Sequence, residues 1–239
     1  RGFKLRMPLD ILFVFTANPE DYTNRGAIVT PLKDRIESQI ITHYPRSIDT
    51  SLQITEQEAN INKEQEQKVK VSDLIKRLIE QVVFEARGSE YVDQKSGVSA
   101  RLTISAYENA ISAAERRSII NNEKEKQVRI TDMLGIIPSI TGKIELVYEG
   151  EQEGPLQVAY NLLDKSVRSL FVQYFPNPDA YKKKKQPAIE NPYKQITQWF
   201  DKGNKLPLQQ DSSDKQREQN LNKVQGLRDI ERTYFPHAY

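Results

Sequence analysis

The most regular hydrophobic pattern in this chain is helical and lies in the middle of the sequence. Between Val71 and Ala86, apolar residues recur at 71, 74, 75, 78, 79, 82 and 83. This is the i, i+3, i+4 spacing of a single helix face. The same spacing returns from Pro155 to Phe175, and a weaker apolar stripe follows Ser99, a good helix cap, to about Arg117. These segments predict a mostly helical body.

Shorter elements are expected around these three helices. The Glu- and Gln-rich stretch 55–67 has few apolar residues and predicts a solvated helix, and 128–137 predicts a short one. Helix propensity returns at 193–201 and 216–234. The alternating stretch Lys143–Tyr148 predicts a brief strand.

The N-terminal region has a different pattern. Asp10–Thr16 (DILFVFT) is an almost continuous run of aromatic, β-branched and other apolar residues. Such a run is typical of a strand buried on both faces of a parallel sheet, and Asn18-Pro19 would end it. Thr30 and Pro31 could start a short helix, and 39–44 could be a second short strand. The predicted fold class is therefore an α/β edge followed by a mostly helical body.

Composition excludes several classes of protein. The 239 residues carry 35 Lys and Arg against 33 Asp and Glu, so the net charge of +2 selects neither nucleic acid nor an anionic membrane. Cysteine is absent and histidine occurs twice, which excludes disulfides, thiolate metal sites and a multi-histidine site within one chain. The longest apolar run, Ile11–Phe15, is far too short to span a bilayer. With no signal peptide, a cytoplasmic location is expected.

The first residues also carry information. The chain opens with Arg1-Gly2-Phe3, and its first methionine is Met7. A cytoplasmic protein normally begins with methionine, so we expect this sequence to be a piece or a processed form of a longer protein.

Three apparent motifs do not hold. Gly142-Lys143 is followed by Ile144 where a phosphate-binding P-loop needs Ser or Thr. The Gly-x-Ser-x pattern at 97–101 ends in arginine and follows no predicted strand, which excludes a nucleophile elbow. The lysine run 182–185 lies among Pro and Tyr residues and is typical of a solvated segment. No basic patch interleaved with aromatic residues supports nucleic-acid binding.

Three segments, in order, resemble a known family. They are FVFTANPEDY (Phe13–Tyr22), TPLKDRI (Thr30–Ile36) and GVSARL (Gly97–Leu102). Together they resemble the second half of an AAA+ ATPase core, in the clade of MoxR and the magnesium-chelatase I subunit. The resemblance implies that Asn18 is the sensor 1 residue, Arg35 the arginine finger and Arg101 the sensor 2 residue of a helical lid.

The resemblance also implies a domain organisation and partners. Residues 1–48 would be the C-terminal part of the AAA+ α/β core, 49–140 the helical lid, and 141–239 a helical C-terminal extension with a polar tail. ATP and Mg²⁺ would be the cofactors of the intact parent, which would form a ring, expected to be a hexamer, and would serve a protein with a von Willebrand A-type domain. The Walker A and Walker B motifs of the family are missing from these residues, so this chain alone should not hydrolyse ATP.

The expected positions suit these roles, although each residue has a simpler interpretation. Asn18 would lie at the C-terminal edge of a parallel strand, where α/β sheets bind ligands, or it could merely form a turn before proline. Arg35 could reach a neighbouring subunit's nucleotide, or pair with nearby acids such as Asp34. Arg25 is a further basic candidate near the subunit edge.

Arg101 also has two interpretations. It lies in the expected first turn of a helix, where free N–H groups and the helix dipole favour an anion. The alternative is a structural ion pair with Glu108 or Asp132.

Two functions follow from these patterns. The first is ATP-driven remodelling or metal chelation by a ring-forming parent, to which this chain supplies sensor 1, the in-trans arginine finger and sensor 2. The second is a non-enzymatic helical interaction module, in which the apolar stripes build a scaffold and the 176–239 tail binds a partner.

Overall fold

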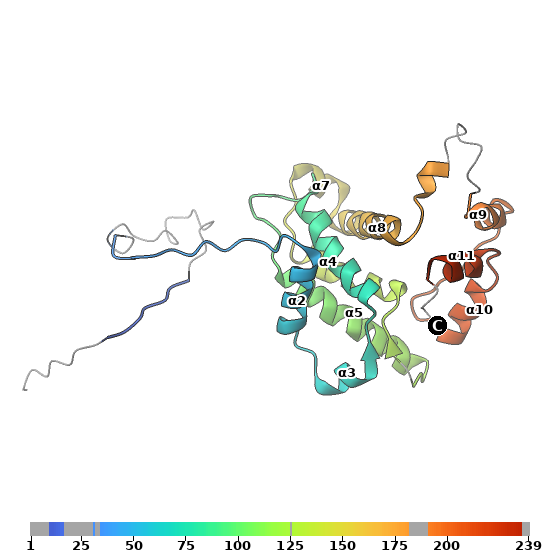
Figure 1. Cartoon of the computed structure of the whole chain (residues 1–239), viewed down its shortest axis with the longest axis horizontal. Helices are drawn as coiled ribbons and strands as arrows, with labels where there is room; N and C mark the ends of the chain where they lie inside the picture. Colours follow the sequence, from blue (N-terminus) through green and yellow to red (C-terminus); the bar gives the residue numbers. More distant parts are fainter. Residues whose placement is uncertain (1–9, 17–30, 32–33, 125, 182–190, 236–239) are drawn as a thin grey trace, which may run out of the picture. The chain divides into compact units, whose positions relative to one another are not determined.

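The computed structural model describes residues 10–16, 31, 34–124, 126–181 and 191–235, and the chain divides into two compact units. The first unit is Arg1–His43 and the second is Tyr44–Tyr239. The second unit holds the helices labelled in Figure 1, and it includes both the expected lid and the expected C-terminal extension.

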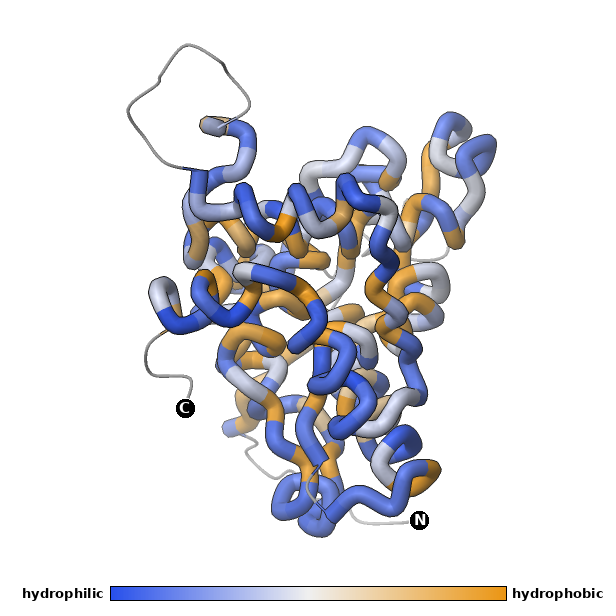
Figure 2. Tube along the Cα trace, turned by 90° about the vertical axis from the view of Figure 1, so that its right-hand side faces the viewer, coloured by the Kyte–Doolittle hydropathy of each residue, from blue (hydrophilic) through white to orange (hydrophobic). Residues whose placement is uncertain are grey.

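The second unit is mostly helical. Its larger helices are α2 (Ile48–Glu58), α4 (Asp73–Arg87), α5 (Arg101–Ile120) and α8 (Pro155–Tyr174), with shorter elements α3 (Lys63–Lys68), η1 (Ile130–Ile136), α6 (Ile137–Thr141), α7 (Tyr148–Glu153), η2 (Pro178–Tyr181), α9 (Lys194–Asp201), α10 (Asp214–Leu221) and α11 (Leu227–Tyr234). Along these helices, apolar positions recur between hydrophilic ones (Figure 2).

The core is built around α4, which packs against α2, α5 and α8. Ser72 caps this helix with its hydroxyl, and the predicted stripe is buried at 75, 78, 79, 82 and 83, while Leu74 stays 38% exposed. Each fully buried aliphatic side chain contributes about 1.5–3 kcal/mol. The predicted helix over 71–86 is therefore confirmed.

The other two long helices are also confirmed, with small shifts at their ends. The helix expected from Ser99 runs from Arg101 to Ile120, and the one expected over 155–175 ends at Tyr174. Pro155 occupies the first turn of α8, directly after Gly154 at φ +97°. Proline suits this position because its missing N–H would have no partner there.

The short helix expected at 128–137 forms differently. Residues 130–136 are a 3₁₀ helix, and an α-helix follows over 137–141. A Cβ added at Gly135 would lie 2.8 Å from the Ala113 Cβ, so η1 runs very close to α5. The tighter winding and the glycine make this approach possible.

Strands are scarce among the described residues. Val69–Lys70 (β1) and Lys126–Gln127 (β2) form a two-residue parallel pair that periodicity does not predict. The strand expected at Lys143–Tyr148 is wrong: only a single antiparallel bridge joins Leu146 to Val92, and α7 begins at Tyr148. Its apolar alternation still places Ile144 and Leu146 against the core.

The strand expected at Asp10–Thr16 is also not seen. These residues are irregular, and the five apolar side chains of Ile11–Phe15 are 50–88% exposed. The second expected strand, 39–44, is irregular too. The physical reason is that a strand needs a neighbour to satisfy its backbone, and no described residue pairs with either segment. An α/β core is therefore not seen in the described part of residues 1–48.

Candidate functional site

The structure places the three expected site residues in different parts of the chain. Asn18 lies outside the described residues, as does Arg25. Arg35 is exposed in the first unit, in a turn, and no described side chain is ion-paired with it. Arg101 is the first residue of α5 in the second unit. The candidate site that can be built from the residues upward is therefore the turn that presents Arg101.

Gly97 makes this turn possible. Its φ is +69°, and a Cβ at this position would lie 2.3 Å from the Tyr44 hydroxyl oxygen. Only glycine adopts this conformation without strain and leaves room for the tyrosine. The next residue, Val98, is 1% exposed, and its carbonyl accepts from Nε and Nη2 of Arg87 at 3.3 and 3.2 Å. The turn is thus fixed from both sides.

Arg87 is held by more than this carbonyl. Its guanidinium carbon lies 4.1 Å from the Tyr44 ring centroid and 5.6 Å from that of Phe84. Such stacking stabilises a cation over the ring face. Burial lowers the pKa of Arg87. Arg87 therefore links the end of α4 to the start of the turn.

Asp93 organises the residues that lead into Gly97. Its carboxylate accepts from the Lys95 N–H at 2.9 Å and from the Ser96 hydroxyl at 3.0 Å, and its carbonyl accepts from the Gly97 N–H at 3.1 Å. The two hydrogen bonds to the carboxylate, first of all the one from the Lys95 N–H, lower the pKa of Asp93. An Asx-type turn of this kind fixes the backbone ahead of the helix.

Ser99 caps the helix as expected, one residue earlier than the formal N-cap. Its hydroxyl accepts from the Arg101 N–H at 3.2 Å and its carbonyl from the Leu102 N–H at 3.0 Å, while Ala100 is the N-cap residue of α5. The result is an exposed arginine at the beginning of a 20-residue helix. The helix dipole makes that end favourable for an anion, although Ser99 already accepts from the first two N–H groups.

The structural ion pairs considered for Arg101 do not form. Glu108 accepts from the Asn60 N–H at 2.8 Å, and Asp132 binds Arg117. No ion pair within the described ranges includes Arg101. Its guanidinium therefore has no structural partner in the part of the chain that the structure describes.

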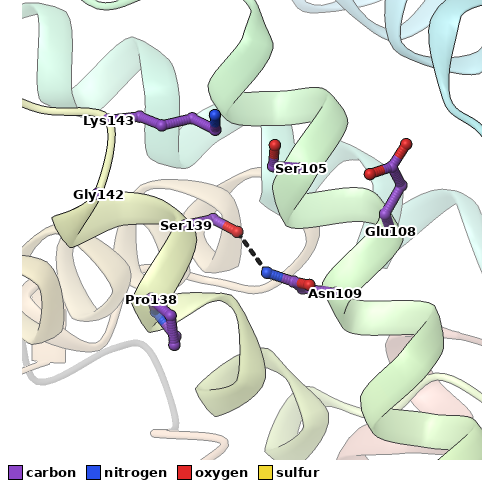
Figure 3. A pocket seen from close by; sticks show the side chains of 7 residues that line it. All are labelled: Ser105, Glu108, Asn109, Pro138, Ser139, Gly142 and Lys143. Atoms are coloured by element: carbon purple, nitrogen blue, oxygen red, sulfur yellow. Dashed lines mark hydrogen bonds between the residues drawn. The ribbon is translucent and has the colours of Figure 1, made fainter.

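A shallow hollow of about 300 Å³ lies beside the next turns of α5. It is lined by Ser105, Glu108, Asn109, Pro138, Ser139, Gly142 and Lys143. Figure 3 shows Lys143 extending toward α5, where Ser105 lies, and the Asn109 amide donating to the Ser139 hydroxyl at 2.6 Å. Ser105 and Glu108 follow Arg101 at i+4 and i+7, so they share its helix face. The hollow offers hydrogen bonds and one exposed lysine.

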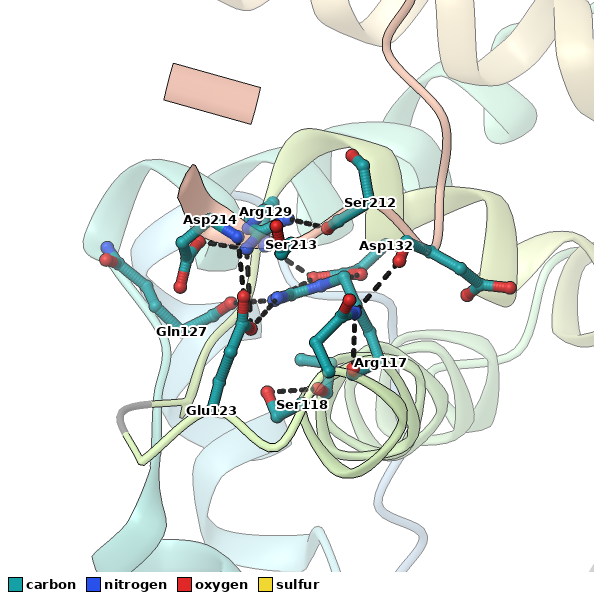
Figure 4. Close-up of polar contacts among 12 residues, drawn as sticks. Arg117, Ser118, Glu123, Gln127, Arg129, Asp132, Ser212, Ser213 and Asp214 are labelled. Carbon is teal, nitrogen blue, oxygen red and sulfur yellow. Dashed lines mark hydrogen bonds and ion pairs between the residues drawn. The ribbon is translucent and has the colours of Figure 1, made fainter. Parts of the chain in front are cut away.

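A buried ion network closes the other end of α5 (Figure 4). Arg117, 1% exposed, donates from Nε to Asp132 Oδ1 at 3.1 Å and from Nη1 to Glu123 Oε2 at 2.9 Å. Its Nη2 also donates to the Gln127 carbonyl at 2.7 Å. Asp132 in turn accepts from the Arg129 N–H at 2.8 Å. Because every member is paired, this cluster is structural.

The same network holds the segment before α10. Arg129 donates to the Ser212 carbonyl at 2.8 Å and is ion-paired with Asp214. Arg116, the neighbour of Arg117 on α5, pairs with Asp211 at 2.5 Å. Residues 211–214 are therefore bound to α5 and η1 by charged contacts.

The sequence indicated one part of this site, the turn at 97–101, but not the residues that hold it in place. The Gly-x-Ser-x-Arg pattern identified the turn at 97–101, but Arg87 and Tyr44, which hold it, are distant in sequence and belong to no motif. The Arg117–Asp132 pair joins residues 15 apart across two elements, so no helical spacing indicates it.

The described residues offer neither a metal cluster nor a membrane-spanning helix. Within the described ranges, no group of three or more His, Cys, Asp or Glu side chains is arranged to hold a metal ion. None of the described helices has the length and apolar character needed to cross a bilayer. No model of a known family, no curated protein and no solved structure matches this chain significantly.

Proposed function

We propose that this chain is the sensor 1-to-lid portion of an AAA+ ATPase of the MoxR and magnesium-chelatase I-subunit type. In the intact parent, Asn18 would be sensor 1, Arg35 an arginine finger acting on the neighbouring subunit, and Arg101 the sensor 2 residue of the lid. The parent would use ATP and Mg²⁺ in a ring, expected to be a hexamer, to remodel a partner or to insert a metal.

The observation that supports this proposal most is the turn at 97–101. Gly97, the buried Val98 carbonyl and Ser99 combine to present Arg101, exposed and without a described ion partner, at the start of α5. A lid residue that senses a nucleotide phosphate needs this combination of a fixed backbone and a free guanidinium. A cation at a helix N-terminus adds to the attraction of the helix dipole for phosphate.

The apolar segment Ile11–Phe15 is the second supporting observation. Its side chains are at least half exposed, and the rings of Phe13 and Phe15, two residues apart, stack with centroids 6.2 Å apart. Side chains at i and i+2 share a face when the backbone is extended. A segment with strand-like spacing and no described partner is what the proposal expects of a sensor 1 strand separated from its sheet.

The residues of this chain suit only part of a nucleotide site. The Arg101 guanidinium could bind a phosphate oxygen, whereas gripping the β- and γ-phosphates and holding Mg²⁺ need the Walker motifs, which these 239 residues lack. ATP and Mg²⁺ are therefore proposed for the intact parent. A partner with a von Willebrand A-type domain is proposed on the family resemblance alone.

Mixed rings of the intact parent would test the arginine finger. Arg35→Ala should reduce ATP hydrolysis by about 10³–10⁵-fold with little loss of nucleotide binding, because a finger acts on the transition state. A second variant, inactivated in its own Walker A lysine, should be equally inactive. Mixing the two should restore hydrolysis, because a finger from one subunit then serves an intact site on the next.

The controls separate a finger from a structural arginine. Arg46→Ala, at another exposed arginine, should leave hydrolysis unchanged. If Arg35→Ala rings keep full activity, or if the mixture stays inactive although mixed rings form, the assignment of Arg35 is wrong. For Arg101→Ala we expect weaker nucleotide binding, with Arg168→Ala on α8 as the matched exposed control.

A non-enzymatic interaction module is the second candidate, because the second unit has its own core. The buried cluster uses residues 69–170, all within that unit. This function predicts a stable 27.6 kDa monomer whose melting temperature does not respond to nucleotide in any longer form of the protein. A nucleotide-dependent shift in the intact parent would exclude it.

A further inference from the structure

A chain of three short polar contacts joins a buried acid on α4 to the N-cap of α5. Thr103 Oγ1 lies 2.8 Å from the Ala100 carbonyl oxygen and 2.8 Å from Thr55 Oγ1. Thr55 Oγ1 lies 2.7 Å from Glu80 Oε1. The side chains of Thr55, Glu80 and Thr103 are at most 1% exposed. At these distances inside the protein, each contact is a hydrogen bond and requires one hydrogen atom.

Counting the hydrogen atoms assigns each donor. The Ala100 carbonyl has none to give, so the Thr103 hydroxyl donates to it. Thr103 has then used its only hydrogen, so Thr55 donates to Thr103. Thr55 has then used its own hydrogen. If each contact is a separate two-centre hydrogen bond, the hydrogen between Thr55 and Glu80 then belongs to the Glu80 carboxyl group.

The other carboxyl oxygen supports the same assignment. Glu80 Oε2 is buried and has no hydrogen-bond partner among the described residues. In a carboxylate this oxygen would share a full negative charge without a donor, which is costly away from water. In a neutral acid it is a carbonyl oxygen, for which the missing hydrogen bond costs less.

We propose that Glu80 is a protonated carboxylic acid in the folded protein at neutral pH, and that its proton orders the contacts holding α2 and α4 against the start of α5. Glu80 is thus a positioning residue. Loss of the proton leaves Thr55 with a single hydrogen for two acceptors, Glu80 and Thr103. One contact must then break, so the attachment of the α5 N-cap depends on pH.

The groups around Glu80 shift its pKa in both directions. Burial raises the pKa of Glu80 and is the largest influence on it. The Ser51 hydroxyl on α2 and the charge of Arg87 on α4 favour the ionised form of Glu80, whereas Glu56 on α2 disfavours it. Thr103 is the group on α5 that closes the chain of contacts.

The consequence for Arg101 rests on the proposed function, whereas the protonation of Glu80 does not. Ala100 immediately precedes Arg101, so the proton on Glu80 helps to fix the backbone from which the proposed sensor residue extends. Measurements on the full 239-residue chain without nucleotide test the proton alone. A failure of the Glu80 inference can therefore be distinguished from a failure of the ATPase proposal.

Chemical unfolding of the full chain at several pH values is the first test. An acid with a raised pKa in the folded state stabilises fully below its unfolded pKa, and this stability is lost as pH rises toward the folded pKa. Within that window, this group alone makes the unfolding equilibrium constant rise tenfold per pH unit. Glu80→Gln, which keeps a hydrogen-bond donor that cannot ionise, should remove this part of the pH dependence of unfolding. Glu58→Gln, at an exposed acid of α2, should keep it.

A second pair of variants does not require Glu80→Gln to fold. Thr103→Val frees the Thr55 hydroxyl to donate to Glu80, so the carboxylate should be favoured and the pH dependence should shrink. Thr103→Ser keeps the hydroxyl and should therefore retain the pH dependence of unfolding. Infrared spectra should show the carbonyl band of a protonated carboxylic acid at neutral pH in the wild type and in Thr103→Ser, and a loss of this band in Thr103→Val.

Two results would overturn the inference. One is an equal pH dependence of unfolding in the wild type and in Glu80→Gln. The other is the absence of a protonated-acid band from the wild type at neutral pH.

Discussion

At the scale of single residues, the turn before α5 depends on Gly97, and the structure separates two reasons for this. The positive φ strains any other residue, and the Tyr44 hydroxyl occupies the space where a Cβ would go. Gly97→Ala should lower the free energy of unfolding by about 1–3 kcal/mol, from a left-handed backbone and the displaced tyrosine together. Urea unfolding of the full chain measures this loss.

Gly203 is a matched control for the first of these reasons. Its φ is +82°, and nothing lies within 4 Å of its missing Cβ. Gly203→Ala should therefore cost the backbone strain alone, about 1–2 kcal/mol. In a Tyr44→Phe background, which lacks the hydroxyl, Gly97→Ala should cost about as much as Gly203→Ala. An unchanged penalty in that background would contradict the role of the Tyr44 hydroxyl.

Asp132 provides a second test at this scale. Its carboxylate and the Arg117 guanidinium are at most 1% exposed, so removing one leaves the other charged and buried. Asp132→Ala should cost about 3–5 kcal/mol in the free energy of unfolding. Asp164→Ala, which removes the acid of an exposed i, i+4 pair with Arg168, should cost at most about 1 kcal/mol. Equal losses would show that the buried network contributes little.

At the scale of elements, hydrophobic periodicity predicted the helices that bury a regular apolar stripe. It failed for strands, whose formation depends on pairing with another strand. The apolar positions of 71–86 and 155–175 specify α4 and α8 because a helix forms its own hydrogen bonds. Strand prediction depends on a partner elsewhere in the chain. The run at 10–16 has the composition of a buried strand but no described neighbour, while the parallel pair β1–β2 has no periodic signal in its two-residue strands.

The candidate site shows the same division. The pattern at 97–101 located a turn and a helix start because glycine and serine have local structural roles there. The Glu80–Thr55–Thr103 contacts could not be predicted, because the three residues lie on three helices and the bonded pairs are 25 and 48 residues apart in the sequence. In the sequence, Thr55 opened a stretch expected to be solvated, whereas it is buried beside Glu80.

At the scale of the whole molecule, the division at residue 43 makes a prediction about folding. The residues of the core cluster all belong to the second unit. Residues 44–239 alone should therefore unfold cooperatively, with a free energy of unfolding within about 1 kcal/mol of the full chain, since deletions away from a core cost little. Circular dichroism during urea unfolding measures this. A loss of cooperativity would show that the second unit needs the first.

The account as a whole depends on the proposal that these residues belong to an AAA+ ATPase. The most direct measurement is the sequence of the reading frame upstream of Arg1 in the native gene. An AAA+ parent should encode a G-x-x-x-x-G-K-[ST] loop after a predicted strand, then an apolar strand that ends in Asp-Glu. A start codon a few residues upstream, with no such loop, would contradict it and would leave the interaction module as the function to pursue.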